Sequence, residues 1–174
     1  MSLIVGLDPG SQRMGYAVIE SDGSKLKHLT HGTLKAPTDK PLHQRLAFLH
    51  ARLCELLEES CGSESATAVE VAIERVFVAK NQASALTLGQ ARGIILLAVG
   101  QRGYQLAEYA PAEIKKAVTG NGRASKAQVA SMVSRLLGVE VDEKEPDSTD
   151  ALAMAICHAA NLQTRRSLAG RLGA

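Results

Sequence analysis

The chain has 174 residues, of which 45% are hydrophobic and 22% are charged, and its formal net charge is +2. These values exclude a disordered or fibrous protein and suit one globular domain with a core of its own. Because the net charge is small, any basic surface for a nucleic acid must be local. No apolar run reaches the ~18 residues of a membrane span, and the N-terminus lacks a signal-peptide pattern, so we expect a cytoplasmic protein. The three cysteines form no Cys-x-x-Cys pair, which argues against a cysteine-based metal or redox site.

Taken in chain order, apolar runs separated by turn residues predict three strands, a helix, a fourth strand, a helix, a fifth strand and three final helices. The expected strands are 3–7, 14–19, 26–34, 67–74 and 104–110. The expected helices are 41–59, 82–99, 111–120, 125–138 and 146–162. This order predicts an α/β protein with a mixed five-stranded sheet flanked by helices. We expect residues 1–162 to form a single domain and residues 163–174 to form a basic tail, for which disorder and contact with DNA both remain open.

Four acidic residues do not fit their apolar surroundings. Asp8 and Glu74 each end an apolar strand, where a carboxylate is costly unless it is paired or bound to a cation. Asp147 and Asp150 are three residues apart at the start of the last helix and therefore lie on one face. If these elements converge, four carboxylates surround one point. Such an all-oxygen site suits Mg²⁺ or Mn²⁺, and two ions ~3.5–4 Å apart are the usual arrangement for hydrolysing a phosphodiester.

Each acid also has an ordinary structural interpretation. Asp8 precedes Pro-Gly and suits a turn, whereas Asp147 suits a helix cap or a first-turn charge. Glu74 has Arg75 and Lys80 nearby in the sequence as pairing partners. Asp150 is harder to explain in this way, because it borders an apolar helical stripe. Spacing alone leaves the convergence of the four open.

Three motifs in this sequence resemble the RuvC family of bacterial Holliday junction resolvases: "GLDPGSQRMGYAVIE", "AIERVFVAKNQASALTLGQARG" and "DSTDALAMAICH". They stand in the family's order and spacing, and the resemblance covers about residues 3–161. It implies a ribonuclease H-like fold, a homodimer, and metal-dependent cutting of two opposed strands of a four-way DNA junction. It also implies Asp8, Glu74, Asp147 and Asp150 as catalytic residues and metal ligands, although some relatives have histidine at the third position. A preference for a T-containing site and cooperation with the RuvA–RuvB branch-migration complex are further implications.

The candidate DNA-binding residues follow the second acid and surround a glycine-rich turn. They are Phe77, Lys80, Lys115, Arg123 and Lys126. Phe77 suits either the core or stacking on an unpaired base. The basic residues suit either phosphate contacts or a solvated face, and the resemblance implies DNA contacts for Phe77, Lys115 and Lys126. The helix at 82–99 is the expected dimer element, unless it packs only on its own sheet.

Three other functions compete with this interpretation. The first motif also resembles the phosphate-binding hairpin of sugar kinases and actin-like ATPases, but those need two such domains and no second hairpin is found. The YqgF-like nucleases share the fold and the first acid, but the long block from Glu74 to Gly93 favours the RuvC family. A non-catalytic junction-binding protein is the third alternative, and the retention of all four acids argues against it.

Overall fold

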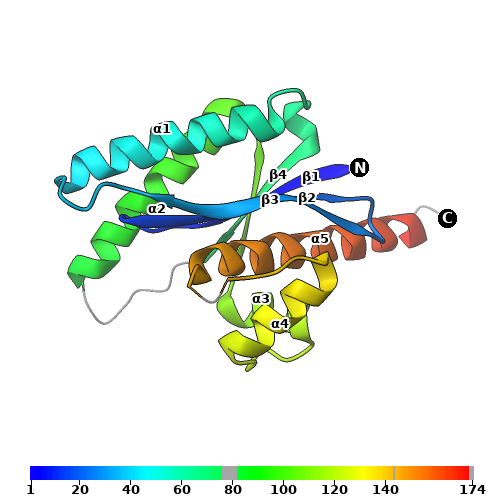
Figure 1. Ribbon diagram of the computed structural model, residues 1–174. Coiled ribbons are helices and arrows are strands. Elements are labelled where there is room, and N and C mark those ends of the chain that lie inside the picture. The colour runs from blue at the N-terminus through cyan, green and yellow to red at the C-terminus, as the bar shows by residue number, and fades with distance from the viewer. Residues whose placement is uncertain (76–81, 143, 173–174) are drawn as a thin grey trace.

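The computed structural model describes residues 1–75, 82–142 and 144–172, with side chains as far as residue 165, and confirms the mixed five-stranded sheet (Figure 1). The strands are β1 (Ser2–Asp8), β2 (Arg13–Ser21), β3 (Leu26–Lys35), β4 (Val69–Glu74) and β5 (Gln105–Tyr109). Their order is β3-β2-β1-β4-β5, with β1 at the centre. β2 runs antiparallel to β1 and β3, whereas β4 runs parallel to β1 and β5. The ends of β1 and β4 therefore meet at one edge of the sheet.

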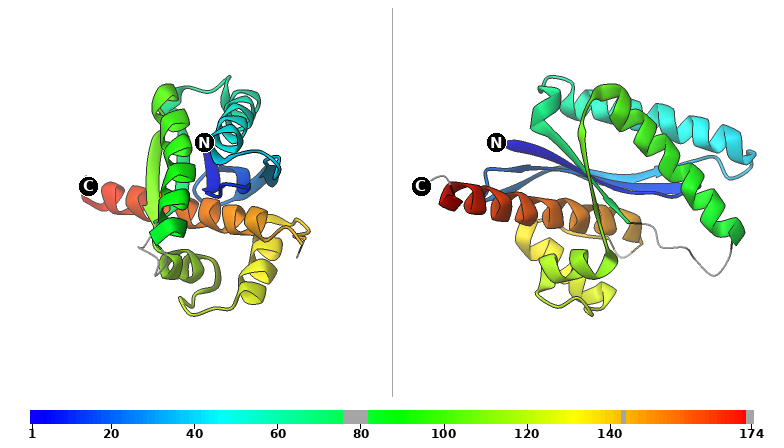
Figure 2. Two further views of the ribbon diagram at one scale, coloured as in Figure 1. Left: turned by 90° about the vertical axis from the view of Figure 1, so that its left-hand side faces the viewer. Right: turned by 180° about the vertical axis from the view of Figure 1, so that it is seen from behind.

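Helices cover both faces of the sheet (Figures 1 and 2). They are α1 (Leu42–Cys61), α2 (Gln82–Arg102), α3 (Pro111–Thr119), α4 (Lys126–Leu137) and α5 (Pro146–Leu172), with a short 3-10 turn at Ala66–Ala68. Leu3, Val5 and Leu7 pack into a core with α1 and α2, whereas Ile4 packs into a second core with α3, α4 and α5. Burial on both faces explains why β1 is a continuous apolar run rather than an alternating one.

The ends of two helices follow from local sequence signals. Ser125 caps α4 by accepting a hydrogen bond from the backbone N–H of Gln128, whose side chain in turn accepts one from the Ser125 N–H. Gly120 and Gly138, which close α3 and α4, have φ angles of +78° and +66°. Glycine is favoured there because other side chains rarely adopt this left-handed conformation.

The last helix is longer than the sequence indicated. We expected it to end at residue 162, but α5 continues to Leu172, so the helix includes most of the segment expected to be a tail. The side-chain oxygen of Thr164 donates to the carbonyl of Ala160, one turn earlier, as expected within a continuous helix.

Helix α2 is long and apolar enough to cross a membrane by length and composition alone. Here it packs on the sheet instead, with Ile95, Ala98 and Val99 buried in the core that it shares with α1. Its Arg92 forms an ion pair with Glu108 at the end of β5. These contacts make α2 an integral element of the domain.

Candidate active site

Three of the four predicted acids line one pocket at the edge of the sheet. Asp8 ends β1 and Glu74 ends the adjacent parallel strand β4, directly after the paired residues Leu7 and Ile73. Asp150 reaches the same pocket from the N-terminal part of α5. The pocket has a volume of about 360 Å³, and its other lining residues are Pro111, Ile114, Lys115, Lys126, Val129 and Ala153. The predicted convergence therefore occurs for Asp8, Glu74 and Asp150.

Two glycines allow α5 to lie directly on the strands that carry the site. A Cβ atom added to Gly6 would lie 2.0 Å from the carbonyl oxygen of Ala151, and one added to Gly15 would lie 1.9 Å from that of Asp147. Gly15 is paired with Asp8 across the β1–β2 ladder. The absence of side chains at these two positions thus brings the start of α5 against the end of β1.

Asp147 lies beside this pocket but does not line it. Its Oδ2 atom accepts a hydrogen bond from Nε of Arg13, at 2.6 Å. A second Arg13 nitrogen, NH2, donates to Glu145 Oε2 at 2.7 Å. The carboxylate of Asp147 is nevertheless close enough to Asp8 to raise the pKa of that residue. Asp147 is therefore held at the rim of the pocket by a charge-assisted hydrogen bond.

The pocket concentrates negative charge. Burial, together with the nearby carboxylates of Asp150, Asp147 and Glu74, raises the pKa of Asp8 to about 7, against an opposing effect of Lys126. Burial and Asp150 also raise the pKa of Glu74. The only direct cation–carboxylate contact among these pocket residues, within the described part of the chain, joins Lys126 Nζ to Asp150 Oδ2 at 3.4 Å. Such a site favours a bound cation.

The donor atoms fit a hard divalent cation. They are carboxylate oxygens, which Mg²⁺ and Mn²⁺ prefer over nitrogen or sulfur. A group of three acidic, histidine or cysteine side chains close enough to hold one ion does not occur within residues 1–75, 82–142 and 144–165. The fit therefore rests on donor type and on the uncompensated charge around Asp8.

Comparisons with known proteins decide the family. The family model of crossover junction endodeoxyribonuclease RuvC matches residues 4–158. The chain belongs to the RuvC family. The RuvC protein of Azorhizobium caulinodans is 45% identical over 159 residues, which are 91% of this chain and 90% of that relative. The RuvC protein of Alkalilimnicola ehrlichii is 45% identical over 172 residues, which are 98% of this chain and 99% of that relative.

A solved structure gives the same answer for the fold. Thermus thermophilus RuvC, determined in complex with a Holliday junction substrate, is 30% identical to this chain and has a TM-score of 0.84. The match covers 95% of this chain and 97% of that structure. The RuvC resemblance of the sequence motifs is thus confirmed, and the kinase-like, actin-like and YqgF-like interpretations are wrong.

The alternative interpretation, in which Glu74 pairs with Arg75, finds no such ion pair among the described residues. The Arg75 guanidinium instead reaches the carbonyl oxygen of Glu108, at 3.5 Å. The other predicted partner, Lys80, lies outside the described residues. Glu74 instead lines the pocket that Asp8 and Asp150 also line.

The predicted DNA-binding residues of this RuvC family member divide into three groups. Lys115 of α3 and Lys126 of α4 line the acidic pocket. Arg123, in the turn between these helices, is exposed and does not line it. Phe77 and Lys80 lie outside the described residues.

Sequence reasoning missed two arginines that contact the site. Arg13 binds Asp147, and Arg92 of α2 donates to the backbone carbonyl of Glu74 at 3.0 Å while pairing with Glu108 at 2.5 Å. Apart from Arg102 at its end, Arg92 is the one charged residue of the apolar helix α2, which is a signal for a buried partner. Arg13 carries no comparable signal, because its partner lies 134 positions away in the sequence.

Proposed function

We propose that this chain resolves four-way Holliday junctions by symmetric paired nicks, in homologous recombination and DNA repair. It is an endonuclease of the RuvC family, and its relatives are named crossover junction endodeoxyribonucleases. The observation that carries the proposal is the single pocket that Asp8, Glu74 and Asp150 share at the edge of the sheet. Its geometry and charge support hydrolysis of a phosphodiester within the pocket.

We assign Asp8, Glu74, Asp147 and Asp150 as catalytic residues that hold two divalent ions, Mg²⁺ or Mn²⁺. Bound there, the ions would supply an activated water and neutralise charge on the leaving oxygen. Asp8 is delivered by the central strand and is therefore fixed in position by neighbours on both sides. Asp147 joins from the rim, next to Arg13.

Lys115 and Lys126 would bind the phosphates on each side of the scissile bond. Both line the pocket, and Lys126 also reduces the repulsion between the carboxylates. Two cations near three acids let a polyanion approach a negatively charged site, since phosphate contacts dominate the affinity for DNA. Arg123 would contact the backbone further out, and Phe77 and Lys80 keep their proposed roles in base stacking and phosphate contact.

A second copy of the chain is the proposed partner of α2. Leu86, Leu96 and Leu97 on this helix have exposed fractions of 67%, 41% and 52%. An isologous contact through such a face would place two pockets symmetrically on a junction of two-fold symmetry. We further propose that the protein acts in the cytoplasm, together with the RuvA–RuvB branch-migration complex.

Cleavage of a synthetic four-way junction, compared with a linear duplex of the same sequence, tests this function. We expect paired nicks at symmetric positions of the junction, in Mg²⁺ or Mn²⁺ and not in excess chelator. Tight junction binding without nicks under any metal condition would instead identify a structural junction-binding protein. Equal cutting of duplex and junction would contradict the structure selectivity.

A further inference from the structure

The pairing of β2 and β3 places two cations side by side near the start of α5. Arg13 and Lys35 are direct partners in the antiparallel ladder. Like charges at paired positions destabilise a sheet unless they are compensated. The compensation comes from Glu145, whose Oε2 accepts from Arg13 at 2.7 Å and whose Oε1 accepts from Lys35 at 2.5 Å.

The contact with Glu145 thus anchors Arg13 independently of Asp147. One nitrogen, NH2, is bound to Glu145, and a different nitrogen, Nε, is bound to Asp147 Oδ2 at 2.6 Å. Side chains from β2, β3, the residue before α5 and α5 itself therefore form one chain of contacts, which we call the Arg13 brace: Lys35–Glu145–Arg13–Asp147. A cation that is anchored at its other end fixes the orientation of the carboxylate that it binds.

The brace leaves one oxygen of Asp147 available. Within the described residues, the hydrogen bonds of this side chain involve Oδ2, and the backbone beneath it rests on Gly15, beside Asp8. Ligating carboxylates commonly have one oxygen hydrogen-bonded by a neighbouring residue, which orients the other oxygen toward the ion. The same arrangement is built here at the rim of the acidic pocket.

We infer that Arg13 is a positioning residue that orients Asp147 for binding a divalent cation. This inference rests on the proposed metal site, to which Asp147 is assigned. Arg13 acts through one carboxylate, so its effect must depend on the presence of Asp147. A lysine at position 13 has a single side-chain nitrogen, so it cannot contact Asp147 and Glu145 through two different atoms as Arg13 does.

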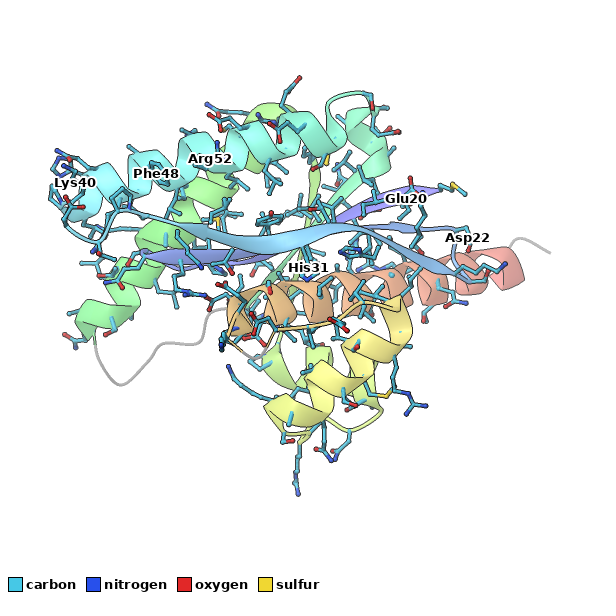
Figure 3. The ribbon with its side chains drawn as sticks, viewed as in Figure 1. Glu20, Asp22, His31, Lys40, Phe48 and Arg52 are labelled. Carbon is cyan, nitrogen blue, oxygen red and sulfur yellow. The ribbon has the colours of Figure 1, made fainter. Side chains whose placement is uncertain are left out.

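The test is a double-mutant cycle on Mn²⁺ binding, measured by titration calorimetry without DNA. The variants are Arg13→Gln, Asp147→Asn and their combination, with Arg13→Lys as a second probe. Arg13 is 41% exposed at its side chain, so these variants are expected to fold, which circular dichroism checks. Lys27→Gln is the matched control, because Lys27 forms a cross-strand ion pair with Glu20 in the same two strands. Arg13 begins β2, whereas Glu20 lies near its other end, close to Asp22 in Figure 3.

We expect Arg13→Gln to weaken Mn²⁺ binding about tenfold and Arg13→Lys to restore it only in part. Arg13→Gln should add no further loss to Asp147→Asn, and Lys27→Gln should leave binding unchanged. A loss that persists in the Asp147→Asn background, or tighter binding by Arg13→Gln, would overturn the inference while leaving the metal site in place. If Asp8→Asn binds Mn²⁺ as well as the unmodified chain does, the proposed metal site fails, and the role of Arg13 fails with it.

Discussion

The ammonium group of Lys126 lies 3.4 Å from the carboxylate of Asp150, inside the pocket that also holds Asp8 and Glu74. The Lys126 side chain is 79% exposed, so this ion pair contributes little to the stability of the fold. Its charge instead offsets the repulsion between the carboxylates, since it lowers the pKa of both Asp8 and Glu74. Lys126 therefore matters for the chemistry of the pocket more than for folding.

We predict that Lys126→Gln reduces junction cleavage by about ten- to a hundredfold, because a preorganised cation is lost from the site. The free energy of unfolding should change by less than about 1 kcal/mol, as for other exposed ion pairs. Single-turnover cleavage and urea denaturation measure the two effects, with Lys27→Gln as the control. A large loss of stability with unchanged cleavage by the folded fraction would contradict this prediction.

Asp8→Asn should stabilise the metal-free protein at alkaline pH. The pKa of Asp8 is raised from 3.8 to about 7, so the native state keeps a proton that the unfolded state releases between these values. Ionisation of Asp8 therefore costs stability as the pH rises toward 7, and the full cost is present at pH 8. In chelator, we expect the melting temperature of Asp8→Asn to exceed that of the unmodified chain by a few degrees at pH 8, and by less at pH 5. An equal difference at both pH values would show that burial does not govern this carboxyl group.

Gly15→Ala should impair both the fold and cleavage. The added Cβ would meet the carbonyl oxygen of Asp147, so α5 must shift away from β2. We expect a destabilisation of about 1–3 kcal/mol, as for other overpacked sites, and loss of junction cleavage by the folded protein. Gly100→Ala in α2 is the matched control, because a Cβ there meets nothing within 4 Å. It should be neutral or stabilising by up to about 1 kcal/mol in chemical denaturation. Similar stability and cleavage for the two variants would contradict the close packing of α5 on Gly15.

His158 should make the protein sensitive to acid. Its Nε2 lies 2.9 Å from Glu70 Oε2, and its Nδ1 lies 2.7 Å from the hydroxyl of Tyr109. Burial lowers the pKa of His158 despite Glu70, so protonation favours the unfolded state as the pH falls below about 6.5. His158→Gln should lower stability by about 1–3 kcal/mol at pH 7.5. The difference from the unmodified chain should shrink at pH 5, as denaturant titrations at the two pH values would reveal. A growing difference at pH 5 would mean that His158 is held in its charged form.

Much of this arrangement could be predicted from the sequence. The continuous apolar run before Asp8 indicated a strand buried on both faces, and β1 is the central strand. Glu74 was recognisable by the same pattern, since local burial and charge conflict at both positions. Confirmation of the family adds the expectation that the acids act together.

The remaining features depend on contacts that no local pattern encodes. The rim position of Asp147 follows from Arg13, which is adjacent only after β2 pairs with β1 and α5 packs on both. The extension of α5 to Leu172 was missed because the sequence after residue 162 becomes polar, and its apolar periodicity fades. Likewise, no local pattern pairs the buried His158 with Tyr109 and Glu70, which lie 49 and 88 positions away in the sequence.

Junction cleavage by Asp8→Asn is the most direct measurement of the central claim, with junction binding followed on the same samples. Asp39→Asn is the matched control, because Asp39 is exposed and pairs only with the adjacent Lys40 among the described residues. We predict that Asp8→Asn binds the junction as tightly as the unmodified chain but makes no paired nicks in Mg²⁺ or Mn²⁺, while Asp39→Asn cuts normally. Normal, metal-dependent cutting by Asp8→Asn would contradict the assignment of this pocket as the nuclease site.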